Sequence, residues 1–118
     1  MEYLNQHKVE QLTREIGVDN IPVLLEIFTG ELITYQQQLN CGNLAAKSAY
    51  LKEISHALKS SAASFGADAL CHLALSVDEA VKQDDFVEKD EDISFMMSCL
   101  NETHQVYSKY LKSLKSNA

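Results

Sequence analysis

Apolar residues recur at alternating spacings of three and four along most of this chain, which is the period of an amphipathic α-helix. The run YLKEISHALKSSAASFGA, residues 50–67, shows it clearly, with Leu51, Ile54, Leu58, Ser61 and Phe65 on one face. No stretch alternates apolar and polar residues in the manner of a half-buried strand. The pattern therefore predicts an all-α protein.

Five helices are expected, and the residues at their ends support the assignment. Gly17 and Gly66 are typical C-terminal stops, and Pro22 suits a first helical turn, where its missing N–H is harmless. Asp19 and Asn20 are each able to cap the helix that follows them. The predicted helices cover about residues 5–16, 20–39, 44–65, 68–82 and 92–114.

The four longer helices are joined by short connections, which favours antiparallel neighbours. With 118 residues, the chain is long enough for one hydrophobic core. We expect a single domain over residues 1–118, built as an antiparallel four-helix bundle with a short additional N-terminal helix. Gly30 lies inside one helix at a cost of about 1 kcal/mol relative to alanine, and close helix packing is one explanation for it.

Charge and cysteine content restrict the classes of function. The formal net charge of −7 argues against nucleic-acid binding, which needs a basic face. The N-terminal run MEYLNQHKVEQL lacks the apolar core of a signal peptide, and no run approaches the roughly 18 apolar residues of a membrane span. Cys41, Cys71 and Cys99 are odd in number and widely spaced, which predicts reduced thiols. We therefore expect a cytoplasmic protein without a membrane partner.

His56 lies nearly opposite the apolar face of its predicted helix. It comes two residues after Ile54 and two before Leu58, and each residue turns the helix by about 100°. The imidazole should therefore face water. Its neighbours three, four or seven positions away are mostly small or charged: Ala49, Lys52, Glu53, Lys59, Ser60 and Ala63. Such a low, open surface suits a large partner that docks over the ring.

The other histidines have ordinary explanations. His104 falls on the apolar face of the last helix, between Leu100 and Tyr107, so a buried or half-buried, hydrogen-bonded side chain is expected. His7 and His72 are expected to be surface or partly buried residues.

Three other chemistries fit the sequence poorly. Glu53 and His56 form an ExxH pair, but a di-iron bundle needs two such pairs facing the core, so we expect no metal site. Ser60, Ser61 and Ser64 lie near the histidine, but a helix offers no oxyanion hole and a nucleophile elbow is absent. No glycine-rich phosphate loop is present. Whatever reacts at His56 must therefore be delivered by another protein.

Lys59 is three residues after His56 and shares its face of the helix. An ammonium group at this position can neutralise a phosphoryl group on the ring without blocking access to it. A neutral imidazole is itself a nucleophile. The pair is therefore suited to carry a phosphoryl group.

The segment HALKSSA, residues 56–62, resembles the HxLKGS/A signature of histidine-containing phosphotransfer (HPt) domains, and FGA, residues 65–67, matches the close of that signature. The runs IGVDNIPVLLEIFTGEL and YLKEISHALKSSAASFGAD extend the resemblance over most of residues 5–110. They resemble those members of the family that act in quorum-sensing phosphorelays.

The resemblance implies a phosphorelay intermediate. His56 would accept a phosphoryl group from the receiver-domain aspartate of a hybrid sensor kinase and pass it reversibly to the aspartate of a downstream response regulator. Lys59 would balance the phosphoryl charge, and the receiver would dock on the surface formed by Ala49, Lys52, Glu53, Ser60 and Ala63. The alternative is a non-catalytic helical module that docks a signalling partner.

The same resemblance implies a monomeric phosphohistidine carrier rather than a stand-alone enzyme, with no autokinase activity. Mg²⁺ is expected on the partner receiver, so no cofactor is expected on this chain. Two positions depart from the family pattern. Ser60 stands where most members have glycine, and its hydroxyl is able to hydrogen-bond the ring or the phosphoryl group. Asp78 stands in the region where members often place a glutamine that orients the imidazole, and a carboxylate within reach of the ring N–H would hold one tautomer.

Overall fold

A computed structural model of the chain describes residues 1–116, and residues 117–118 of the predicted domain lie outside the described part. Within residues 1–116 the chain forms five α-helices and no β-strand, so the predicted all-α class is confirmed. The helices are α1 (Gln6–Ile16), α2 (Ile21–Leu39), α3 (Leu44–Phe65), α4 (Asp68–Lys82) and α5 (Asp90–Ser116).

The ends of the helices follow local capping chemistry. The Asn43 side chain accepts a hydrogen bond of 2.9 Å from the backbone N–H of Ala46 and so starts α3. α5 begins two residues before its predicted start, because Asp90 and its acidic neighbours favour the positive end of the helix dipole. Asn20 precedes α2 but makes no capping bond there; its Nδ2 instead donates to the carbonyl of Ile16 at 2.7 Å.

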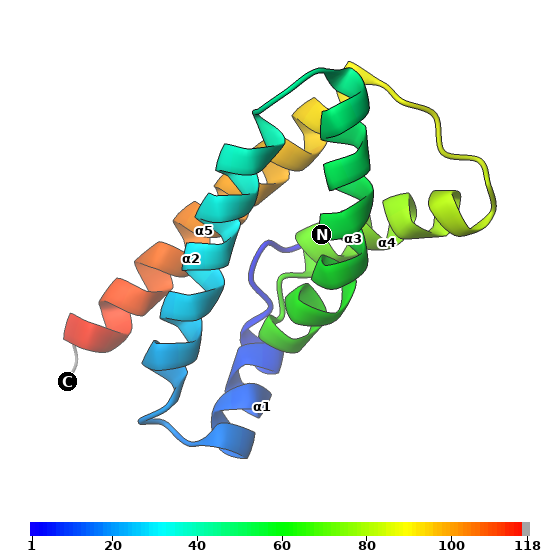
Figure 1. Cartoon of the computed structure of the whole chain (residues 1–118). Helices are drawn as coiled ribbons and strands as arrows, with labels where there is room; N and C mark the ends of the chain where they lie inside the picture. The colour runs from blue at the N-terminus through cyan, green and yellow to red at the C-terminus, as the bar shows by residue number, and fades with distance from the viewer. Residues whose placement is uncertain (117–118) are drawn as a thin grey trace.

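The helices pack most closely as two pairs, α2 with α5 and α3 with α4. α2 and α5 lie side by side and run in opposite directions, while α4 extends away from the lower half of α3 (Figure 1). Contacts between the two pairs are sparser, so the antiparallel four-helix arrangement stays a prediction. All four helices contribute side chains to one core, which includes Leu25, Phe28, Leu32, Leu51, Leu58, Leu70, Met96, Leu100 and Tyr107.

An aromatic cluster holds the C-terminal end of α3 in place. The ring of Phe65 stacks on that of Phe28 from α2, with centroids 4.4 Å apart. The buried hydroxyl of Tyr107 on α5 donates a 2.7 Å hydrogen bond to the Phe65 carbonyl, and burial raises the pKa of that hydroxyl well above its ordinary value. α3 is therefore anchored to both members of the other pair at the end where it turns into α4.

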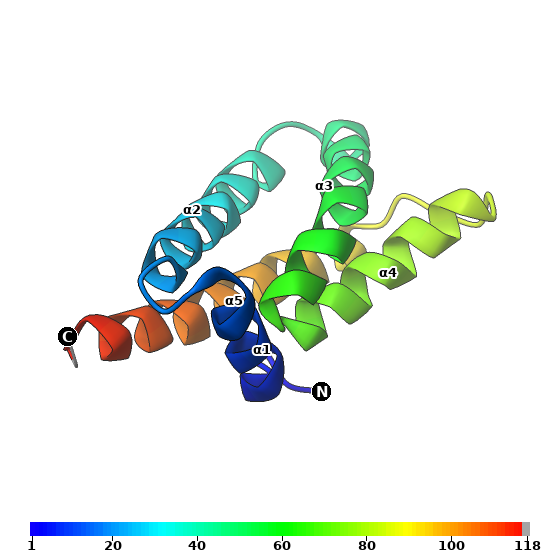
Figure 2. The same cartoon turned by 90° about the horizontal axis from the view of Figure 1, so that it is seen from below.

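The N-terminal segment is tied to the turn between α3 and α4, and α1 lies beside the end of α3 in both views (Figures 1 and 2). The backbone N–H of Asn5 donates to the Gly66 carbonyl at 2.7 Å. The Lys8 ammonium forms a 2.8 Å ion pair with Asp68 in the first turn of α4. These contacts hold the relative position of α3 and α4, on which the site described below depends.

Gly30 is exposed on α2, and a Cβ built there has no neighbour within 4 Å. Close helix packing therefore does not explain this glycine.

Among residues 1–116, no helix is both long and apolar enough to cross a bilayer.

Candidate functional site

His56 stands on the solvent side of α3, as its spacing from the apolar face predicts. Its side chain is 69% exposed, whereas Ile54 and Leu58, two residues before and after it, are buried in the core. The helix thus holds the imidazole on a rigid element while leaving it accessible to a large molecule.

Asp78, from the neighbouring helix α4, contacts the imidazole. Its Oδ1 lies 3.2 Å from Nδ1 of His56, and its side chain is only 9% exposed. Because a carboxylate only accepts hydrogen bonds, this contact requires the ring proton to be on Nδ1. In the neutral ring, Nε2 is then the nitrogen with a free lone pair.

The other carboxylate oxygen of Asp78, Oδ2, forms ion pairs with two lysines. Oδ2 accepts from Lys59 Nζ at 2.7 Å and lies 3.1 Å from Lys82 Nζ. The hydrogen bond from Lys59, with those from Lys82 and His56, holds the pKa of Asp78 well below its usual range. The hydrogen bond to Asp78 in turn raises the pKa of Lys59. One carboxylate therefore faces two ammonium groups, which leaves one net positive charge beside the exposed ring.

Lys82 is a member of this cluster that the sequence analysis did not identify. It is the last residue of α4 and lies four residues after Asp78, a spacing at which opposite charges commonly pair on a helix. That spacing is visible in the sequence, but it links Lys82 to the site only once Asp78 is known to contact His56.

The five residues predicted to form the docking surface are all exposed on α3: Ala49, Lys52, Glu53, Ser60 and Ala63. The backbone carbonyl of Ser60 accepts a 3.1 Å hydrogen bond from the Ser64 hydroxyl. The Lys52 ammonium lies 4.9 Å from the ring centre of Phe86, in the segment between α4 and α5. The predicted docking surface therefore borders this connecting segment, which the sequence pattern did not indicate.

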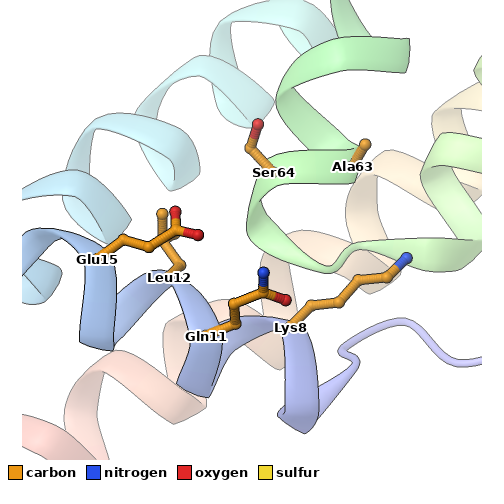
Figure 3. A pocket seen from close by; sticks show the side chains of 6 residues that line it. All are labelled: Lys8, Gln11, Leu12, Glu15, Ala63 and Ser64. Carbon is orange, nitrogen blue, oxygen red and sulfur yellow. The ribbon is translucent and has the colours of Figure 1, made fainter.

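A pocket of about 390 Å³ opens between α1 and the C-terminal turns of α3 (Figure 3). Ala63 and Ser64 line it from α3, and Lys8, Gln11, Leu12 and Glu15 line it from α1. Because Ala63 belongs to the predicted docking surface, this surface continues into a groove whose other wall is α1. Gln11 and Glu15 could not be assigned to it from the sequence, because α1 carries no motif.

The remaining histidines lie outside this cluster. His104 is half-buried, and its Nε2 is 3.4 Å from the Ser108 hydroxyl, as expected for a residue on an apolar face. His7 and His72 are exposed. In the described part of the chain, no three His, Cys, Asp or Glu side chains come together in a way that could hold a metal ion.

Comparison with known proteins gives a consistent result. Residues 23–106 match the Hpt domain family. Over 107 residues the chain is 53% identical to the "Phosphorelay protein LuxU" of Vibrio vulnificus (strain YJ016). The matched region covers 91% of this chain and 93% of the relative. Proteins of the same name from Vibrio cholerae serotype O1 and Vibrio harveyi are 49% and 48% identical over 91% of this chain and 95% and 94% of their own lengths. No solved structure matches the chain.

Proposed function

Because this chain belongs to the Hpt domain family, we propose that it is a phosphorelay intermediate whose phosphoryl acceptor is His56. The observation that carries the proposal is the contact between Asp78 Oδ1 and His56 Nδ1 on an otherwise exposed ring. That contact leaves Nε2 unprotonated and available to an incoming phosphorus atom. An ordinary surface histidine has no such constraint on its tautomer.

The transfer follows from this tautomer. The Nε2 lone pair attacks the phosphorus of an aspartyl phosphate on the partner; an N–P bond forms, the P–O bond to the aspartyl carboxyl breaks, and the carboxylate leaves with the bonding electrons. The Nδ1 proton stays on the ring, which becomes a cation bearing a phosphoryl dianion. The Asp78 carboxylate stabilises that cation through the charge-assisted Nδ1–H hydrogen bond.

In this proposal the Lys59 ammonium neutralises the negative charge of the phosphoryl group. It lies three residues after His56, its side chain is 22% exposed, and its Nζ is already held beside the ring by Asp78. Because a phosphoramidate and an acyl phosphate are both high-energy species, the group can move in either direction. The chain then acts as a carrier, without autokinase activity.

The partners follow from the chemistry and the family. We propose that a receiver domain of a hybrid sensor kinase donates the group and that a response regulator of the LuxO type accepts it, in a quorum-sensing phosphorelay. Each receiver would bring its own Mg²⁺, so this chain needs no cofactor. We further propose that the protein acts as a cytoplasmic monomer and that α2–α5 form an antiparallel four-helix bundle with α1 as the short additional helix.

Phosphoryl transfer from a phosphorylated receiver domain tests the proposal. Wild-type protein should acquire a label that is labile in acid and stable in base, which is the behaviour of a phosphohistidine. His56→Gln should lose the label and keep its helical circular dichroism. His72→Gln, which changes an exposed histidine on α4, should be labelled like wild type. If a competent donor leaves wild type unlabelled, the chain is a docking module instead.

A further inference from the structure

The arrangement of Lys59 and Lys82 around one oxygen of Asp78 carries a further inference, which rests on the proposed phosphotransfer function. Both ammonium groups contact Oδ2, at 2.7 Å and 3.1 Å. Only Oδ1 is left for the imidazole, at 3.2 Å from Nδ1. A single carboxylate therefore joins the nucleophile to two cations.

The two lysines differ in their surroundings. Lys59 lies within the C-terminal half of α3, and its side chain is 22% exposed. Lys82 is the C-terminal residue of α4, and its side chain is 61% exposed. Lys59 is therefore confined near the ring, whereas Lys82 belongs to the same helix as Asp78 and reaches it from the solvent side.

The phosphoryl group creates a conflict for Lys59. To neutralise the phosphoryl oxygens, the Lys59 ammonium must divide its charge and its three N–H donors between them and Asp78, so its pairing with Asp78 weakens. Asp78 is 9% exposed, and a largely buried carboxylate that loses its ion-pair partner is destabilised. Without a second cation on Oδ2, the Nδ1 contact alone would fix the Asp78 side chain, and its orientation toward the ring would be less well defined.

We propose that Lys82 is a positioning residue that keeps Asp78 paired, and therefore directed at His56 Nδ1, while Lys59 turns to the phosphoryl group. The i, i+4 placement of Lys82 lets it remain on Oδ2 whichever way Lys59 points. Two lysines thus divide two tasks that a single lysine would have to share. Lys82 acts through Asp78 and does not need to touch the phosphoryl group.

The variants that test this role are Lys82→Met, Lys82→Arg and, as a control, Lys112→Met, which removes an equivalent exposed charge from α5. Initial rates of labelling by a phosphorylated receiver and the lifetime of the phosphohistidine are measured for each. Lys82→Met should slow labelling and shorten the lifetime by about two- to fivefold, in keeping with the modest strength of exposed ion pairs. Lys82→Arg should restore both to within about twofold of wild type, because it keeps the charge.

Two further measurements separate positioning from direct contact or from a structural role. In an Asp78→Asn background, Lys82→Met should have no additional effect, because the residue through which it acts is gone. ¹⁵N NMR of the His56 ring should show a shift of the Nδ1 resonance in phosphorylated Lys82→Met, and little change in the unphosphorylated variant, where Lys59 still pairs with Asp78.

The outcomes are distinguishable from a failure of the proposed function. Unlabelled wild type overturns the phosphotransfer proposal itself. Labelled wild type with Lys82→Met equal to Lys112→Met overturns only the role of Lys82. An undiminished effect of Lys82→Met in the Asp78→Asn background would instead mean that Lys82 acts directly on the phosphoryl group.

Discussion

Oδ1 of Asp78 on α4 lies 3.2 Å from Nδ1 of His56 on α3, so a carboxylate from one helix selects the tautomer of an exposed imidazole on another. The aspartate is largely buried and the histidine largely exposed. A rigid, ionised acceptor therefore lies beside a ring that remains open to a partner, an arrangement that suits a phosphohistidine carrier. Four predictions test the consequences of this arrangement.

Lys59→Ala should shorten the lifetime of the phosphohistidine by about fivefold, because the phosphoryl charge loses a cation that Asp78 holds on the same face as His56. The helical content should not change, since the Lys59 side chain carries its ammonium at the surface of α3. Label retention after removal of the donor measures the lifetime, and circular dichroism measures the fold. An unchanged lifetime would remove the role assigned to Lys59.

Ala63→Arg should slow phosphoryl transfer by more than about tenfold, because a large side chain would fill the low surface beside the groove lined by α1 and α3. Helices tolerate arginine well, so folding should be retained. The control is Gln105→Arg, which adds the same charge at an exposed position on α5. Transfer rates are measured at several protein concentrations. Equal rates for the two variants would place the docking surface elsewhere.

Asp78 should stabilise the fold in a pH-dependent way. Its pKa in the folded state is lowered, chiefly by the hydrogen bond from Lys59, below the value of about 4 expected in the unfolded chain. The folded state therefore favours the ionised form, so this stabilisation is fully present above about pH 4 and is lost as the pH falls toward the folded-state pKa.

The comparison of wild type with Asp78→Asn measures that contribution. Urea unfolding should show wild type to be more stable at pH 6, and the difference should shrink at pH 3. A difference that grows on acidification would have the wrong sign for a lowered pKa.

Gly66→Ala should destabilise the protein by about 1–3 kcal/mol, because Gly66 adopts φ +77° and an added Cβ would lie 2.9 Å from the Asn5 carbonyl oxygen. Gly30→Ala provides the contrast. Gly30 is inside α2 and a Cβ there meets nothing within 4 Å, so alanine should stabilise by about 0.5–1 kcal/mol. Denaturant unfolding of both variants tests the pair. A Gly66→Ala variant as stable as wild type would contradict the strain and the close approach to Asn5.

The helices and the exposure of His56 were predictable from the sequence because both depend on periodicity within one segment. The apolar spacing in residues 44–65 determines which face of α3 is buried, and His56 falls on the other face whatever packs against the helix. Lys59 was predictable for the same reason, as a neighbour on that face. The explanation of Gly30 could not be decided in this way, because a glycine within one helix does not reveal whether another helix approaches it.

Only the tertiary structure decided which residues from other helices reach the ring. Asp78 was a candidate from its region of the chain, but its contact with Nδ1 depends on the rotation and register of α4 against α3. The pairing of Lys82 with the same carboxylate and the groove wall supplied by Gln11 and Glu15 depend on the same packing. Local periodicity specifies each helix's own faces, whereas the distance between side chains of different helices is determined by how their surfaces interlock in the core.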